Sequence, residues 1–296
     1  RTFKLKCAIK KDKEEYYQCM TGKNIKFENP NFVEVFQTQK PFNQTIKVKN
    51  VDNINLAKDN KIFSWNHLHQ NNTNNIGNID YSYPKKNLYN SVNLKTKINS
   101  GYLLSYNGNI IFNDISGSIF KYSPVENKKS LLYNFYGGNK KLKKFKKKLY
   151  MNISEGNLYI ADNLGYFYKI DLSNSKIIWA KNYRVPFRSE IKIYKNNLYL
   201  INEKNILYSI SKDTGDIIWQ FKTKESNLNT SFVSSITIKD DNLIILNTSG
   251  EIYSIDINTR RINWIHNTFS QEVSNNTLLF FPQPLVSDDN YLFYSS

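Results

Sequence analysis

Apolar and polar positions follow one repeated order in three stretches of the second half of the chain. Each stretch has a short apolar strand, a turn, a strand with alternating apolar and polar residues, a second turn, and a strand that carries a Trp. The stretches are 155–183, 195–223 and 240–268, and their Trp residues, Trp179, Trp219 and Trp264, are separated by 40 and 45 positions. A fainter copy, 107–136, has Tyr133 in the place of the Trp. Self-similarity at this period is typical of repeat architectures.

The strands and turns of each copy predict one four-stranded unit. Gly165, Asn205 and Gly250 share one offset before the alternating strand, and hairpin turns favour such residues because they require positive φ. We therefore expect these three residues in equivalent turns. The segment before each copy, such as SEIKIY or SSITIK, supplies a fourth strand. The pattern predicts an all-β fold, a β-propeller of four-stranded antiparallel blades, over residues 41–296.

The Trp of each copy has a predicted structural role. A four-stranded blade is apolar on both faces and has to be covered by its neighbours. A ring near the end of a strand, wedged between two blades, buries about 150–250 Å². We predict inter-blade packing for Trp179, Trp219 and Trp264, and favour it over stacking on a cofactor.

Two segments lie outside this pattern. Residues 1–40 have no clear period and are interpreted as an N-terminal extension. Residues 61–82 are rich in Asn and contain His67 and His69, which would share one face of a strand and could bind a metal. No third ligand is close in the sequence, so a structural surface loop is the favoured interpretation.

The composition fits a packed chain and limits the candidate chemistry. Aromatic residues make up 15% of the chain, too many for a disordered one. The net charge is +16, but Lys and Asn are frequent in every segment, so the charge allows a polyanion or anionic-membrane partner without demonstrating one. No apolar run approaches the roughly 18 residues that a membrane helix needs. Cys7 and Cys19 either pair or remain thiols, and a zinc site is not expected.

The strongest local charge is a run of seven lysines from Lys140 to Lys148. One interpretation is a patch for anionic lipid or nucleic acid. The other, which the overall Lys content favours, is a solvated loop between two blades.

The repeat, an apolar strand, a Gly turn, (I/L)Y-x-(I/L)D and then TG-x-x-x-W, resembles the pyrroloquinoline-quinone-type propeller repeat. DTGDIIW, residues 213–219, is its clearest copy. Within that superfamily the chain looks most like the BamB family of outer-membrane assembly lipoproteins. SWNHLHQNNTNNIGNI, from Ser64, and VPFRSEIKI, from Val185, support this over roughly residues 60–296.

The resemblance implies an eight-bladed propeller at the periplasmic face of the outer membrane, held by a lipid anchor. It also implies binding to the barrel-inserting subunit and no catalysis. The family's partner-binding Leu-Arg pair falls on Phe187 and Arg188, which we expect on a loop that projects from one rim, where truncating both side chains to Ala would barely change folding. The alternative interpretation is that Phe187 caps the core and Arg188 is solvated. The family's second, acidic contact region reads LNTSFVSS here, from Leu228, without a carboxylate, and LKC at Leu5 lacks the small residue of a lipobox. DDNYLFYSS opens a further repeat, so we expect a truncated propeller.

The rival interpretation is a fragment of a quinoprotein dehydrogenase. Such enzymes share this repeat, but they need a metal-bound quinone held by Glu, Asn and Asp, often under a vicinal disulfide. The sequence shows no adjacent Cys pair and no nucleophile–His–acid or phosphate-loop motif. A WD-type scaffold is disfavoured because Gly-His and Trp-Asp signatures are missing. We therefore expect no catalytic residue, no metal and no cofactor.

Overall fold

The computed structural model describes residues 61–80, 93–94, 98–225, 231–268 and 281–295. The chain divides into two compact units, Arg1–Asn55 and Leu56–Ser296, and the described residues all belong to the second. The expected N-terminal extension, 1–40, and both Cys7 and Cys19 lie outside the described residues.

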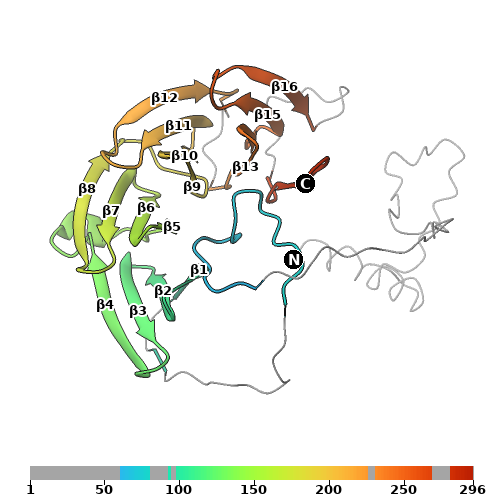
Figure 1. Ribbon diagram of the computed structural model, residues 1–296. Coiled ribbons are helices and arrows are strands. Elements are labelled where there is room, and N and C mark those ends of the chain that lie inside the picture. Colours follow the sequence, from blue (N-terminus) through green and yellow to red (C-terminus); the bar gives the residue numbers. More distant parts are fainter. Residues whose placement is uncertain (1–60, 81–92, 95–97, 226–230, 269–280, 296) are drawn as a thin grey trace, which may run out of the picture. The chain divides into compact units, whose positions relative to one another are not determined.

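Four antiparallel sheets of four strands follow one another along the chain, with strands in sequence order within each sheet (Figure 1). We number these sheets as the first to the fourth blade. A two-stranded sheet and a single short helix, α3 (Lys140–Lys143), complete the described elements. The strands are β1 (Ile98–Tyr106), β2 (Asn109–Asp114), β3 (Ser118–Ser123) and β4 (Lys128–Asn134) in the first blade; β5 (Leu149–Ser154), β6 (Asn157–Asp162), β7 (Tyr166–Asp171) and β8 (Lys176–Asn182) in the second; β9 (Lys192–Tyr194), β10 (Asn197–Ile201), β11 (Ile206–Ser211) and β12 (Ile217–Lys222) in the third; β13 (Ser235–Lys239), β14 (Asn242–Leu246), β15 (Glu251–Asp256) and β16 (Ile262–Asn267) in the fourth; and β17 (Val286–Ser287) and β18 (Leu292–Phe293).

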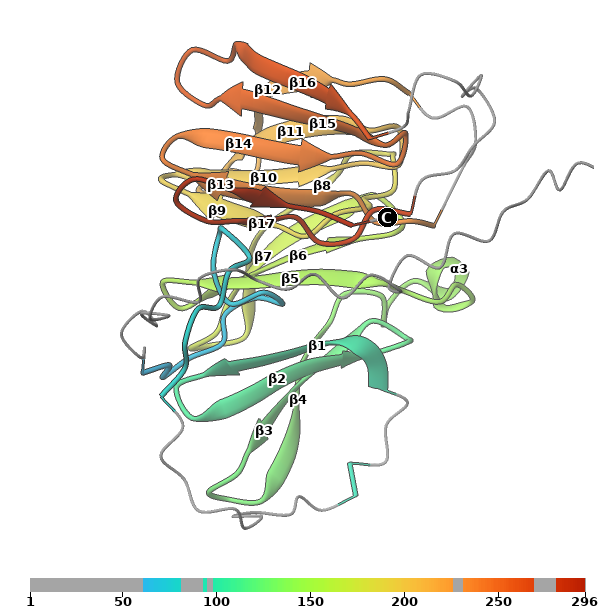
Figure 2. The same cartoon turned by 90° about the vertical axis from the view of Figure 1, so that its right-hand side faces the viewer.

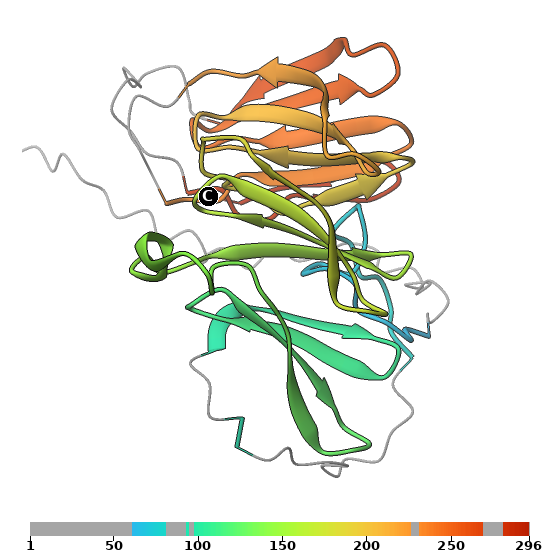
Figure 3. The ribbon, with the colours of Figure 1, turned by 90° about the vertical axis from the view of Figure 1, so that its left-hand side faces the viewer.

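The blades pack on one another through their first strands. β1 contacts β5, β5 contacts β9, β9 contacts β13, and β13 contacts β17. The first strand of each blade is therefore the innermost and the fourth the outermost, and Figures 2 and 3 show the sheets stacked in this way. One apolar cluster extends from Leu104 in the first blade to Ile210 in the third, so the core lies between blades as well as within them. The all-β fold of four-stranded antiparallel blades predicted from the repeats is confirmed.

The strand directions separate the loops into two ends. In each blade, the hairpins after the first and third strands lie at one end. The hairpin after the second strand and the connection to the next blade lie at the other end, because neighbouring strands are antiparallel. We call this second end the connection rim; it includes the connections 135–148, 183–191 and, where described, 223–234.

The predicted equivalent turns are found in the hairpins after the second strands. Gly165, Asn205 and Gly250 have φ values of 90°, 58° and 75°, and each donates its N–H to the backbone carbonyl of an Asp or Asn three residues earlier. The side chain of that Asp or Asn accepts backbone N–H bonds from the residues two and four positions after it, as Asp162 does from Leu164 and Tyr166 at 2.8 Å. Asn202 and Asn247 repeat this pattern. The turns are set locally, because Asx side chains bond their own following backbone.

The Trp residues show how the blades cover one another. Trp179 is 8% exposed, and its Nε1 donates to the carbonyl of Lys212 in the third blade at 3.3 Å. Trp219 packs on Tyr199 and against a cluster that joins the third and fourth blades. Trp264 is 42% exposed, so the prediction of inter-blade burial is wrong for this residue. The two-stranded sheet of β17 and β18 follows the fourth blade and contacts its inner strand, β13. Every residue of the outer strand, β16, is exposed.

Candidate protein-interaction site

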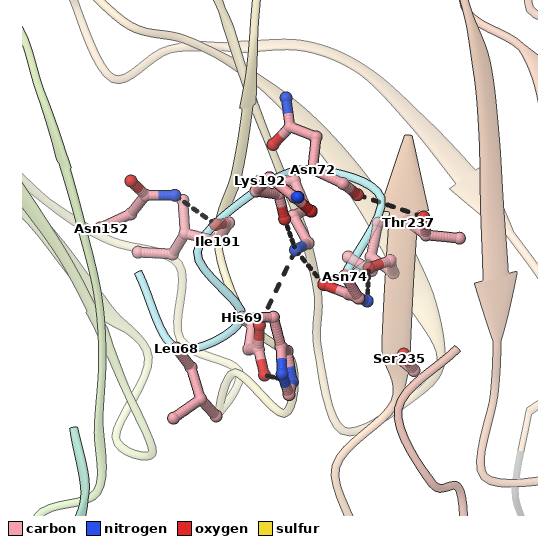
Figure 4. A network of polar contacts seen from close by, with 12 residues as sticks. Leu68, His69, Asn72, Asn74, Asn152, Ile191, Lys192, Ser235 and Thr237 are labelled. Atoms are coloured by element: carbon pink, nitrogen blue, oxygen red, sulfur yellow. Dashed lines mark hydrogen bonds and ion pairs between the residues drawn. The ribbon is translucent and has the colours of Figure 1, made fainter. Parts of the chain in front are cut away.

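A polar segment, residues 65–75, crosses the innermost strands of successive blades; we call it the axial segment. It forms hydrogen bonds with the first strand of each blade in turn and then with β17. Figure 4 shows the contacts of Asn72 and Asn74 near Lys192 and Thr237. The bonds are Trp65 N to Ser105 O (2.8 Å), Ile153 N to Asn66 O (2.8 Å), Asn72 Nδ2 to Ile193 O (2.8 Å), Ile238 N to Asn72 O (2.9 Å) and Ser287 N to Thr73 O (2.9 Å). The segment therefore satisfies backbone groups of five inner strands that have no neighbour on that side.

The Asn side chains explain why this polar sequence lies inside. The buried Asn74 donates through Nδ2 to the carbonyls of Ile236 (3.0 Å) and Leu285 (2.7 Å). An amide with two donors can pair two carbonyls at once, and buried polar groups have to be paired. The expectation of a structural surface loop is therefore wrong in its location. The segment is structural, but His67 and Asn74 are buried against the inner strands.

Lys192 on β9 lies at the centre of this network. Its side chain is fully buried, and Nζ donates to Asn71 O at 3.0 Å and to Asn74 Oδ1. Nζ also lies 3.9 Å from Glu190 Oε2. Burial lowers the pKa of Lys192 to about 8, while the charge of Glu190 opposes that change. Lys192 ties the axial segment to the third blade.

The two histidines of the axial segment differ in their surroundings, because His67 is buried and His69 is half-buried. Burial, and then the charge of Lys192, lower the pKa of His67 to about 2, so this ring is neutral. His69 Nε2 lies 2.8 Å from Glu190 Oε1, and this pair lies next to Lys192 (Figure 4). Among the described residues, His, Cys, Asp and Glu form no group of three that could hold a metal.

A pocket opens at the connection rim beside this pair, with a cavity volume of about 500 Å³. Its walls come from the axial segment, the start of β5, and the connections before β13 and β17. The apolar lining includes Leu68, Leu149, Val233 and Phe281, and the polar lining includes His69, Lys148, Glu190 and Ser234. Phe281 is 55% exposed, and its ring packs edge-on against Phe232 at 4.9 Å. An apolar pocket with a few charged groups at its edge suits an apolar side chain from a partner.

Phe187, predicted to contact a partner, lies in the core. Its side chain is 0% exposed and packs edge-on against Phe167, Tyr183 and Tyr208, with ring centroids 5.3–6.1 Å apart. The expectation that neither residue of the pair belongs to the core is therefore wrong for Phe187. The connection 183–191 turns inward at this point, because Phe187 N donates a hydrogen bond to Asp162 O. The Phe187 ring then lies between the second and third blades.

Arg188 lies between the core and the rim. Its NH1 donates to Phe187 O at 3.1 Å, and NH2 lies 3.6 Å from Glu203 Oε2. Its backbone joins two blades: Arg188 N donates to Ile201 O, and Ser234 N donates to Arg188 O. Its side chain keeps 16% of its surface exposed. The contact of Arg188 with a partner stays a prediction.

The sequence did not identify Glu190 and Lys192 as site residues. Both lie within SEIKIY, which indicates a strand and nothing more. The available signal was the Asn-rich run after Trp65, whose many amides are more than a surface turn needs. Of the second predicted contact region, 228–235, residues 231–235 are described, and Val233, Ser234 and Ser235 line the pocket.

Four-stranded antiparallel blades packed through their inner strands define this protein as a β-propeller. Residues 140–296 match a family described as "Outer membrane protein assembly factor BamB". The match covers more than half of the chain, so the chain belongs to this family of propellers with pyrroloquinoline-quinone-type repeats. No curated protein sequence matches the chain.

Solved structures support the fold. The chain is similar to BamB from Moraxella catarrhalis, with a TM-score of 0.53 and 13% identity, over 70% of this chain and 60% of that one. It is also similar to Sqt1 from Saccharomyces cerevisiae, with a TM-score of 0.50 and 13% identity, over 66% of this chain and 55% of that one. At such low sequence identity, these similarities show the fold alone. The chain spans 60% or less of either structure. The described residues contain no helix long and apolar enough to cross a membrane.

Proposed function

We propose that this protein is a non-enzymatic scaffold that binds a protein subunit through its connection rim. The observation that carries the proposal is the rim pocket, which combines an exposed aromatic wall with the His69–Glu190 pair and Lys148. Large rings and charged side chains around one cavity are typical of interface hot spots. Family membership supports a scaffold, and rigid blades that present loops suit protein recognition.

The rim is pre-ordered for binding. The backbone of Arg188 is bonded to Ile201 and Ser234, and its guanidinium lies against Phe187 O and Glu203. A partner that meets such a surface loses less conformational entropy than one that has to order a free loop. In this proposal Phe187 holds Arg188 in position from the core, and Arg188 and Phe281 make the contact.

By the same proposal, the partner is the barrel-inserting subunit of outer-membrane β-barrel assembly. The protein would then act at the periplasmic face of the outer membrane and be held there by a lipid anchor. The family description supports this assignment.

The test is a pull-down of the barrel-inserting subunit by variants that keep the fold. Phe281→Ala should weaken binding by about 2 kcal/mol, as truncation of a hot spot does. Phe293→Ala is the matched control, because Phe293 on β18 is 57% exposed and does not line the pocket. Arg188→Gln should also weaken binding, whereas Arg184→Gln, at an exposed position of the same connection, should not.

Equal binding by Phe281→Ala and Phe293→Ala would contradict the assignment of the pocket. The rival function, a quinoprotein dehydrogenase, is tested by adding pyrroloquinoline quinone and Ca²⁺. Dye-linked alcohol oxidation by the protein under these conditions would contradict the scaffold proposal.

A further inference from the structure

Lysines and one exposed aromatic ring form a projecting loop between the first and second blades. We call residues 139–148 the lysine loop. It contains α3 and leads into β5, and Figures 2 and 3 show α3 projecting past the start of that strand. Phe145 is 57% exposed. The exposed lysines of the loop are Lys140, Lys141, Lys143, Lys144, Lys146 and Lys148.

Hydrogen bonds hold the base of the lysine loop. Asn139 Oδ1 caps α3 by accepting from Lys141 N at 3.0 Å and Leu142 N at 3.3 Å. Asn163, in the adjacent hairpin, accepts from Lys148 N at 2.8 Å and donates to Lys146 O at 3.1 Å. The end of the loop is therefore attached to the adjacent hairpin, α3 is capped at its start, and the exposed lysines are directed to solvent.

One lysine of the loop differs from the rest. Lys147 is buried, and its Nζ lies 4.9 Å from the Tyr136 ring centre and donates to Leu142 O at 2.5 Å. This side chain supports the loop from inside. In the described part of the chain, the exposed lysines form no ion pair. Their charges are therefore available to an external partner.

The charge of the loop is also locally unbalanced. Between Glu126 and Glu155 the sequence has nine lysines and no Asp or Glu. A high overall Lys content explains frequent lysines, but the longer stretch without Asp or Glu, between Asp80 and Asp114, has only four of them. A local field of one sign attracts an anionic surface.

We propose that the lysine loop binds the surface of an anionic lipid bilayer, with Phe145 inserted at the headgroup level. Ammonium groups are strongly hydrated point charges, which suit a diffuse layer of headgroups better than a shaped pocket. Each Lys near such a surface adds to binding, and an aromatic ring among lysines is typical of interfacial segments. Single-stranded nucleic acid would match the charge, but its binding sites present several stacking rings, and the loop exposes one.

The inference does not depend on the proposed function. The lysine loop and the candidate interaction site both lie on the connection rim, so binding by the loop would orient this rim toward the membrane.

The experiment is co-sedimentation of the protein with vesicles of phosphatidylglycerol and phosphatidylcholine, compared with vesicles of phosphatidylcholine alone. The loop variant combines Lys140→Gln, Lys141→Gln, Lys143→Gln and Lys144→Gln. It should bind the anionic vesicles about a thousandfold more weakly than the parent, since each of the four Lys near the surface contributes about 1 kcal/mol. Binding by the parent should fall at about 0.5 M salt, where screening shortens the range of the charges.

The control variant removes the same charge at the opposite end of the blades: Lys128→Gln, Lys176→Gln, Arg260→Gln and Arg261→Gln, all at exposed positions. This variant should bind nearly as the parent does. Phe145→Ser should weaken binding several-fold without a change in net charge. Thermal melts of all variants should match the parent, because none of these side chains is buried.

Three results would overturn the proposal. The first is unchanged vesicle binding by the folded loop variant. The second is an equal loss in the control variant, because binding would then follow net charge alone. The third is a loss of binding to a single-stranded RNA probe with vesicle binding retained, which would make the loop a nucleic-acid site.

Discussion

The second and fourth blades carry the same repeat and differ in what covers them. In the second blade Trp179 on β8 is buried, whereas Trp264 occupies the same position on β16 and is exposed. Both Trp residues lie opposite the fourth residue of the preceding strand, Lys169 and Ser254 respectively, and both follow a register shift. The local structure is therefore the same, and the difference comes from the neighbouring blade.

The third blade supplies the cover for Trp179. The hairpin between β11 and β12 places Gly215 against the indole, and the carbonyl of Lys212 accepts its N–H. In the described part of the chain no such hairpin lies over β16. A repeat thus specifies a blade, and the next repeat specifies how much of that blade is buried.

The largest expected effect is the loss of a Trp in the covered blade. Trp179→Ala should lower the free energy of unfolding by about 3–5 kcal/mol, since it leaves a large cavity between two blades. Trp264→Ala should cost no more than about 1 kcal/mol, because this ring is already half in water. Urea unfolding measures the free energy of unfolding of both variants. Similar decreases for the two would mean that packing against the next blade does not determine how much a Trp stabilises the fold.

The second prediction concerns the other side of the same joint. Phe187→Ala should lower the free energy of unfolding by about 3 kcal/mol, because its ring fills the space among Phe167, Tyr183 and Tyr208. Phe293→Ala, at an exposed position, should change it by less than about 0.5 kcal/mol. A thermal melt of Phe187→Ala that matches the parent would return this residue to the exposed role predicted from the sequence.

A smaller effect is expected where the third blade meets Trp179. Gly215 has φ of 72°, and a Cβ there would lie 2.7 Å from the indole. Gly215→Ala should therefore lower the free energy of unfolding by about 1–3 kcal/mol more than Gly108→Ala does. Gly108 is the matched control because it has φ of 70° and no atom within 4 Å of its added Cβ. Both variants carry the same backbone strain, so equal losses in urea unfolding would show that the indole moves aside.

The smallest effect compares one turn residue between blades. Asp162 stands where the third and fourth blades have Asn202 and Asn247, and burial raises its pKa despite the hydrogen bonds from Tyr136 and the turn. A raised pKa means that the folded state binds the proton more tightly than the unfolded chain does. The contribution to stability is then greatest below the unfolded pKa and is lost as pH rises through the folded value.

Asp162→Asn should therefore be more stable than the parent at neutral pH, by less than about 1 kcal/mol. The advantage should shrink as the pH falls and the parent carboxyl is protonated. Thermal melts from about pH 4 to pH 8 follow the difference. A difference that stays constant over this range would contradict a folded-state titration of Asp162.

Part of the site could be predicted and part could not. The sequence correctly predicted the strands, the turns at Gly165, Asn205 and Gly250, and the burial of Trp179. It also selected the 61–82 segment and the pair Phe187 and Arg188 as unusual, but it placed the segment on the surface and left open whether Phe187 contacts a partner or caps the core. The inward turn of Phe187 depends on rings from three other strands or connections, and hydropathy along the chain does not report these contacts.

By itself, the sequence determined the blades, because alternation, Asx turns and positive φ are decided within a few residues. The tertiary structure alone decided which polar residues lie inside. Asn74 pairs with Leu285, 211 positions away, and Lys192 is buried by a segment that lies more than a hundred positions before it. The sequence predicted cover for the Trp of every repeat, and only the tertiary structure decided that Trp264 lacks it. The physical reason is that burial depends on which surfaces meet after folding, whereas a turn depends on its own side chains.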